Sequence, residues 1–187
     1  MSPKSIGPVL APPVGARDHA QGPASAPVTL VEYGDYECPH CGRAYPIVKA
    51  VQKRLGQRLR FVFRNFPLSE IHPNATHAAE AAEAAGEQGK FWEMHDALFE
   101  NQDALEPADL IAHSARIGID SDKLADELKS HAHAARVHED FMGGVRSGVN
   151  GTPTFFLNGE RYDGPWDYQD LLAALEAVIA APAERSR

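Results

Sequence analysis

The first third of the chain alternates between short apolar runs and a segment with helical spacing. Val28 to Tyr33 is a β-branched run that predicts a buried strand, and Leu59 to Phe66 predicts a second one. The segment between them has helical spacing, and Gly56 is expected to end it. Its apolar face consists of Ile47, Val48, Val51 and Leu55. The order strand, helix, strand predicts a parallel pair joined by a right-handed crossover.

Residues 72–148 have helical spacing throughout and predict a block of five helices. The first is alanine-rich and is expected to stop at Gly86. The third is expected to begin at Pro107, because proline suits the first turn of a helix. The predicted helices are Ala75–Ala85, a helix containing Phe91 to Leu98, Pro107 to Gly118, a helix containing Leu124 and Leu128, and His133 to Arg146.

The end of the chain predicts a hairpin followed by a helix. Thr154 to Leu157 and Glu160 to Tyr162 are strand-like and are joined by Asn158-Gly159. An Asn-Gly pair supplies the positive φ angles of a type I′ turn. The last helix is expected from about Asp167 to Ala181, with Pro182 closing it.

The two halves of the predicted sheet are each too small to fold alone, so we expect them to form one sheet. The helical block then lies between them as an insertion. Six of the 14 prolines fall within the first 27 residues, which predicts an extended or disordered arm there. The expected division is an N-terminal arm (1–25), an α/β domain in two pieces (26–71 and 149–182) and an inserted helical subdomain (72–148).

Composition excludes several classes of partner. An apolar fraction of 43% with 24% charged residues is typical of a globular protein with a core. The net charge of −8 and the lack of a basic stripe argue against nucleic-acid binding. The sequence contains no run of about 18 apolar residues, so we expect neither a transmembrane helix nor membrane association. The first residues contain Lys4 but no apolar segment of a secretory signal, which predicts a cytoplasmic location, or a periplasmic one if the chain has been trimmed.

The only two cysteines, Cys38 and Cys41, flank a Pro-His pair between the first predicted strand and the predicted helix. This spacing at a helix start brings both sulfurs within bonding distance, and the free N–H groups there stabilise a thiolate on the first sulfur. We therefore expect Cys38 to be the exposed nucleophile and Cys41 the resolving thiol. His40 is expected to lower the pKa of Cys38 by a hydrogen bond or positive charge. Asp35 and Glu37 are expected to raise that pKa somewhat unless solvent screens them.

A zinc site is the competing interpretation, because C-x-x-C is also half of many zinc sites. A tetrahedral structural site needs two further ligands, which here would have to be histidines or carboxylates. Of the nine histidines, only His40 is close in sequence, and it lies between the two sulfurs. His131 and His133 are expected on different sides of a helix. The strand before the motif and the helix after it favour redox use, so we expect no metal and no cofactor.

A resemblance to a known family is carried by the segment Val31 to Cys41, VEYGDYECPHC. It is similar to the strand and active-site turn of the DsbA-like branch of the thioredoxin superfamily. The pair Pro39-His40 is similar to that of the strongly oxidising members, and Phe91 to Phe99 is similar to part of the branch's inserted helices. Over about residues 26–181, the resemblance implies a thioredoxin-like α/β fold, βαβ followed by ββα, with an inserted helical subdomain. It also implies thiol–disulfide oxidoreductase activity.

The resemblance assigns further positions around the motif. It implies a cis peptide bond before Pro153, facing the disulfide, with the backbone of Thr152 presented to an extended substrate. From the residues alone, Pro153 also fits the start of an edge strand. Glu32 matches a buried acidic position, where burial would raise its pKa and suit it to proton exchange with Cys41, although an exposed edge carboxylate is the alternative. Pro46 matches a proline that bends the active-site helix.

The expected partners are proteins or small molecules that carry a disulfide or a thiol, together with a redox partner that the sequence does not identify. The best-known oxidising members of the branch are exported, whereas no export signal is visible here. In a reducing cytoplasm, reductase activity is expected as much as oxidation. Two alternatives stay open: a glutathione-dependent transferase or isomerase of the same fold, and a zinc-binding interaction module without catalysis.

Overall fold

A five-stranded sheet lies at the centre of the structure, a computed structural model that describes residues 8–181. The strand order is β1-β3-β2-β4-β5, in which β2 and β3 are parallel and the other neighbours antiparallel. The strands are β1 His19–Gln21, β2 Val28–Gly34, β3 Leu59–Asn65, β4 Thr154–Leu157 and β5 Glu160–Tyr162. The helices are α1 Pro39–Leu55, the short 3-10 helix η1 Gly56–Arg58, α2 Ala75–Glu87, α3 Phe91–Glu100, α4 Pro107–Ile117, α5 Ser121–Ser130, α6 Ala134–Arg146 and α7 Tyr168–Ala180.

The elements β2, α1 and β3 form the predicted parallel unit. Val28 pairs with Leu59 at one end of the register. Pro39 is the first residue of α1, where its missing N–H leaves no helical bond unmade. The helix continues through Pro46 and ends at Leu55, and the capping Gly56 has a φ of 54°, which favours glycine. This unit places the start of α1 at the carboxyl end of β2.

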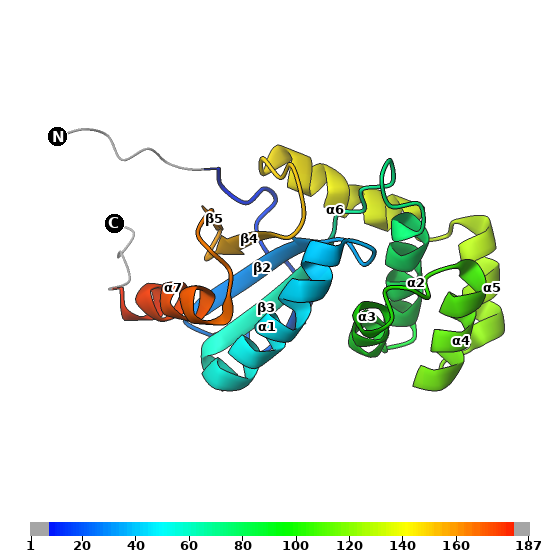
Figure 1. The fold of residues 1–187 in the computed structure, drawn as a ribbon, viewed down its shortest axis with the longest axis horizontal. Helices are drawn as coiled ribbons and strands as arrows, with labels where there is room; N and C mark the ends of the chain where they lie inside the picture. Colours follow the sequence, from blue (N-terminus) through cyan, green and yellow to red (C-terminus); the bar gives the residue numbers. More distant parts are fainter. Residues whose placement is uncertain (1–7, 182–187) are drawn as a thin grey trace.

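Hydrophobic side chains cover both faces of the sheet. On one face, α1 and α7 pack on Leu30 and Phe61, and the core continues into the inserted helices. On the other face, α6 and the N-terminal segment cover Val31, Val62 and Phe156. Figure 1 shows α1 in front of β2 and β3, with α2 to α5 stacked beside the sheet. The sheet is therefore the middle layer between two helical ones.

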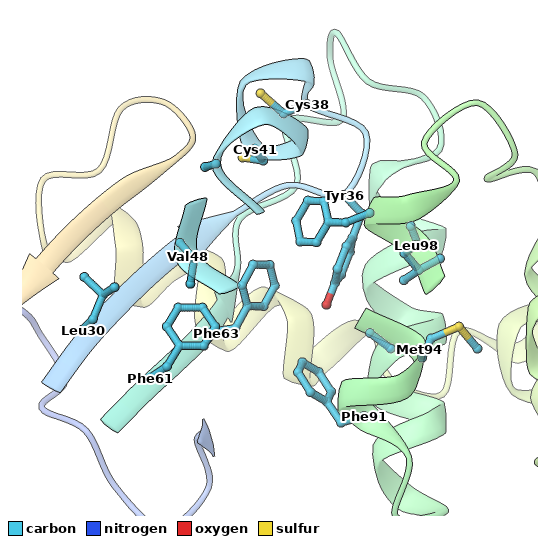
Figure 2. Close-up of a cluster of buried hydrophobic side chains, with 14 of the residues drawn as sticks. Leu30, Tyr36, Cys38, Cys41, Val48, Phe61, Phe63, Phe91, Met94 and Leu98 are labelled. Carbon is cyan, nitrogen blue, oxygen red and sulfur yellow. The ribbon is translucent and has the colours of Figure 1, made fainter. Parts of the chain in front are cut away.

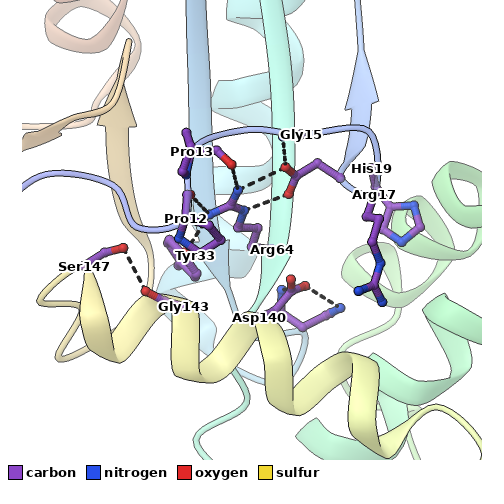
Figure 3. A network of polar contacts seen from close by, with 12 residues as sticks. Pro12, Pro13, Gly15, Arg17, His19, Tyr33, Arg64, Asp140, Gly143 and Ser147 are labelled. Carbon is purple, nitrogen blue, oxygen red and sulfur yellow. Dashed lines mark hydrogen bonds and ion pairs between the residues drawn. The ribbon is translucent and has the colours of Figure 1, made fainter.

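From residue 8 on, the N-terminal segment packs on the domain, which corrects the predicted extended or disordered arm over residues 8–25. Its strand β1 adds an antiparallel edge to β3. Arg64 of β3 holds the rest of the segment, because its guanidinium donates to the Asp18 carboxylate at 2.7 and 3.0 Å and to the carbonyls of Pro12 and Pro13 (Figure 3). The proline-rich composition was a misleading signal here. Prolines lack an N–H but keep a carbonyl acceptor, and the segment is bound through those carbonyls.

The inserted block contains the five predicted helices, α2 to α6, and so the predicted fold class is confirmed. Two helix ends differ from the prediction. α2 continues through Gly86, which is a packing position: a Cβ there would lie 3.2 Å from His19 and 3.6 Å from Phe91. α6 begins at Ala134, one residue later than predicted.

The C-terminal hairpin also follows the prediction, since Asn158 and Gly159 have φ values of 46° and 86°. Among residues 8–181, no helix has both the length and the apolar character that crossing a membrane requires. Two predicted features lie outside the described residues: the first seven residues of the arm and the closing Pro182.

Candidate active site

The carboxyl end of β2 leads through a tight turn into α1, and this junction carries both cysteines. Cys38 is the N-cap residue of α1, with φ −72° and ψ 122°. Its N–H donates to the Asp35 carbonyl at 3.1 Å, and its carbonyl accepts from the Gly42 N–H at 3.0 Å. Cys41 lies in the first turn of the helix, and both residues are free thiols. Figure 2 shows the two sulfurs close together at this end of α1.

The Cys38 sulfur lies in surroundings that favour its anion. A hydrogen bond from the Cys41 side chain is the largest cause that lowers the pKa of Cys38, to about 5. The Thr152 side chain and the backbone N–H groups of Cys41 and His40 lower it further, against an opposing effect of burial. Cys38 is only 4% exposed, so the predicted nucleophile is more covered than expected. These surroundings favour the thiolate at neutral pH.

Cys41 and Glu32 are both buried beneath the Cys38 sulfur. Burial is the largest cause that raises the pKa of the fully buried Cys41, and the hydrogen bond to Cys38 and the Glu32 charge add to it. Glu32 is 2% exposed, as the buried interpretation predicted. Burial, and then the charge of Cys38, raise the pKa of Glu32 to about 8. Among residues 8–181, its Oε1 has no hydrogen-bond partner, and the raised pKa keeps much of Glu32 protonated at neutral pH.

The loop before β4 faces the Cys38 sulfur. The Cys38 sulfur lies 3.5 Å from the Thr152 carbonyl, to which it donates when it is protonated. The peptide bond between Thr152 and Pro153 is cis. The Thr152 hydroxyl is buried and has no hydrogen-bond partner within residues 8–181. It is therefore placed to donate to the thiolate.

His40 contributes to this site differently from what the sequence suggested. Its side chain is exposed, and its Nδ1 accepts a hydrogen bond from the Arg43 guanidinium at 2.6 Å. What it provides to Cys38 is its backbone N–H. The expected hydrogen bond or charge from the imidazole is replaced by the amide at the helix start. Pro39, also exposed, fills the first position of α1.

Asp35, which would be screened by solvent if it were exposed, is buried. One of its carboxylate oxygens accepts from the Leu68 N–H at 2.9 Å and from His72 Nδ1 at 2.7 Å. Its backbone N–H donates to Cys41 Sγ at 3.5 Å. Asp35 thus fastens the active-site turn to the loop that follows β3.

Glu37 makes a second link to the same loop. Its carboxylate accepts the backbone N–H of Asn74 at 2.6 Å and the side-chain amide of Asn74 at 3.1 Å. These partners lie 37 positions away in the chain, as His72 does from Asp35. Local sequence patterns contain no signal for such pairs, which the fold alone brings together.

The arrangement has the parts that sulfur exchange needs: a thiolate, a protonated thiol beside it and a buried carboxyl that can hold a proton. Within residues 8–181, no group of three or more His, Cys, Asp or Glu side chains is arranged to hold a metal ion.

Comparison with known proteins assigns most of the chain to one family. A family model described as "Thioredoxin" matches residues 16–177. A protein of Salinispora arenicola named Na(+)/H(+) antiporter NhaA 1 is 47% identical over 171 residues, covering 91% of this chain and 26% of that protein. The NhaA antiporter of Herminiimonas arsenicoxydans is 42% identical over 90% of this chain and 27% of its own length. The chain thus spans about a quarter of these relatives.

Solved structures are similar over nearly the whole chain. Oxidised BdbD from Bacillus subtilis has a TM-score of 0.83 and 26% identity, covering 94% of this chain and 100% of that one. A thioredoxin-like oxidoreductase from Silicibacter pomeroyi has a TM-score of 0.79 and 26% identity, covering 90% and 95%. The catalytic domain of Proteus mirabilis ScsC has the same fold, with a TM-score of 0.76 and 19% identity. The match covers 89% of this chain and 92% of that one.

Proposed function

Since this chain belongs to the thioredoxin family, we propose that it is a thiol–disulfide oxidoreductase of the DsbA type. The observation that carries the proposal is the contrast between two neighbouring thiols. Cys38, at the helix start, has a pKa of about 5, whereas burial raises the pKa of Cys41 well above its ordinary value. One sulfur is ready to attack while the other keeps its proton.

The exchange proceeds in two steps. The Cys38 thiolate attacks one sulfur of a partner disulfide, forming a mixed disulfide, and the other partner sulfur leaves as a thiolate. Cys41 then loses its proton and attacks Cys38 Sγ, which closes the Cys38–Cys41 disulfide and releases the second partner sulfur. Two electrons pass from the cysteine pair to the partner. Part of the raised Glu32 pKa comes from the Cys38 charge, and that charge is gone once Cys38 is bound in the mixed disulfide. Glu32 then ionises more readily, and its carboxylate accepts the Cys41 proton in the second step.

The same steps in reverse oxidise a partner dithiol, and the Cys38 pKa favours that direction. A stabilised thiolate stabilises the reduced pair, so the disulfide form is the stronger oxidant. In this direction the protein takes two electrons from a partner dithiol, and a second disulfide-carrying redox partner regenerates it. Thr152 would present its backbone to the partner chain beside Cys38, with Pro153 next to it.

The names of the matched relatives describe antiporters about four times as long as the matched part. The chemistry of the residues described here is that of sulfur exchange, and we propose that the corresponding quarter of those proteins has the same activity. A cytoplasmic location stays a prediction.

The test is turnover of a disulfide substrate, such as insulin reduced in the presence of a small thiol. We expect Cys38→Ser to lose the activity. Cys41→Ser should instead accumulate a mixed disulfide between Cys38 and a cystine-containing peptide, visible as one added peptide mass. Wild-type turnover by Cys38→Ser would remove the proposal.

Two measurements separate the alternatives. Activity with glutathione that survives Cys41→Ala would indicate a transferase with a single nucleophile. One equivalent of zinc bound through both cysteines, in protein purified without added metal, would indicate a binding module.

A further inference from the structure

We propose that Gln102 is a positioning residue for Cys38, acting from the inserted helical block on the active-site turn. The inference rests on the proposed function, because it concerns the thiolate that performs the exchange. The Gln102 side-chain amide donates to the carbonyl of Tyr36 at 2.8 Å and to the carbonyl of Cys38 at 2.9 Å. Both hydrogens of one amide thus bind the backbone on the two sides of Glu37.

The loop that carries Gln102 is fixed to α1 by several contacts of α3. Lys49 of α1 pairs with Asp96 at 2.6 Å, and the Tyr45 hydroxyl donates to Glu100 at 3.0 Å. The ring of Phe99 lies 5.4 Å from that of Tyr45. Because α3 is held against α1 in this way, the Gln102 amide approaches the turn from a defined direction.

Gly42 leaves the space that Gln102 occupies. A Cβ at position 42 would lie 2.0 Å from the Gln102 Oε1 and 2.6 Å from its Cδ, too close for both groups to remain. Glycine in a helix is less stable than alanine by about 1 kcal/mol. Its presence in the first turns of α1 therefore has a packing reason, which is access of the Gln102 side chain to the turn.

The clamp acts on the atoms that stabilise the thiolate. The Cys38 carbonyl bound by Gln102 also accepts the Gly42 N–H, which closes the first turn of α1. When this carbonyl is fixed, the N–H groups of His40 and Cys41 stay directed at the Cys38 sulfur. Without the clamp, the first turn can fray, and the thiolate loses part of their stabilisation.

The test compares Gln102→Met, which keeps the length of the side chain and adds no charge, with the wild type. We expect the pKa of Cys38, read from thiolate absorbance, to rise by about half a unit to one unit, and the equilibrium constant with glutathione to change about three- to tenfold. Gln88→Met is the matched control. Gln88 is a glutamine of the same helical block that binds the backbone of Asp120, far along the chain from the motif. It should leave both values unchanged.

Gly42→Ala gives an independent test in which Gln102 itself is intact. The added methyl should displace the amide and raise the pKa of Cys38, although alanine favours the helix and should not lower stability. In the double variant Gly42→Ala/Gln102→Ala, the pKa should equal that of Gln102→Ala alone, because the two changes remove the same contact.

The outcomes distinguish this inference from the proposed function. An unchanged Cys38 pKa and glutathione equilibrium in both Gln102→Met and Gly42→Ala would overturn the positioning role while leaving the exchange chemistry intact. Additive shifts in the double variant would also overturn it. Turnover that persists in Cys38→Ser would instead refute the function itself.

Discussion

At the scale of single residues, the fold lowers the pKa of Cys38 and raises that of Cys41, although the two cysteines are only three positions apart. The sequence was sufficient to identify Cys38 and Cys41, to expect burial of Glu32 and to place Thr152 near the motif. It was not sufficient for the orientation of His40. An imidazole on a helix end can turn toward the sulfur or toward the next turn, and here Arg43 binds it. Such choices depend on neighbours in space.

The contrast between the cysteines leads to a prediction about their hydrogen bond. Because donation from Cys41 is the largest cause of the low Cys38 pKa, Cys41→Ala should raise that pKa from about 5 by about one unit or more. Cys41→Ser keeps a hydroxyl donor and should give an intermediate value. The pH dependence of iodoacetamide alkylation measures all three, and equal midpoints in wild type and Cys41→Ala would contradict the prediction.

At the scale of elements, periodic segments were predictable and unperiodic ones were not. The strands and helices follow local spacing, which the sequence displays directly. The N-terminal segment has no period, and its attachment depends on the pairing of β1 with β3, on apolar packing and on a buried guanidinium from β3. The links of Asp35 and Glu37 to the loop after β3, and of Gln102 to the turn, were invisible for the same reason. Each joins residues that only the completed fold brings together.

The attachment of the N-terminal segment can be tested at the Arg64–Asp18 pair. Their side chains are 3% and 8% exposed, so Asp18→Asn leaves a buried charge without its counter-ion and should cost about 3 kcal/mol of unfolding free energy. Glu139→Gln is the control, since the Arg17–Glu139 pair is mostly exposed and should change stability by less than about 0.5 kcal/mol. Urea unfolding measures both, and equal effects would argue against the buried pair as the anchor.

At the scale of the whole molecule, we expect the redox state of the Cys38–Cys41 pair to change the stability of the entire fold. Only the reduced form has the Cys38 thiolate, and the folded structure stabilises it relative to the unfolded chain. A group whose pKa is lowered by folding adds stability above its unfolded pKa and loses it as pH falls through its folded pKa. Glu32 behaves oppositely, since its raised pKa removes stability as pH rises toward about 8. Burial is the largest cause of the raised Glu32 pKa, and Glu32 is buried whether or not the two cysteines are joined, so most of this loss of stability is common to both redox forms.

The difference between the two forms is therefore the quantity to measure. We expect the unfolding free energy of the reduced protein, minus that of the oxidised protein, to decline as pH falls from about 9 to about 5 and to level off below. Urea unfolding with and without reductant gives the difference at each pH. In Cys38→Ala, reductant should have no effect on the pH dependence. A difference that does not vary with pH in the wild type would contradict a thiolate stabilised by folding.

The recessed position of Cys38 has a consequence for which molecules it can meet. With 4% of its surface open and the Thr152 carbonyl 3.5 Å from its sulfur, little room is left for an approaching group. We therefore expect a cystine in a rigid, convex surface to react slowly, because its backbone collides with this site before the two sulfurs meet. A cystine in a frayed loop, a nascent polypeptide or a small metabolite should react faster, so that the mobility of the target should matter more than the amino acids that flank the cystine.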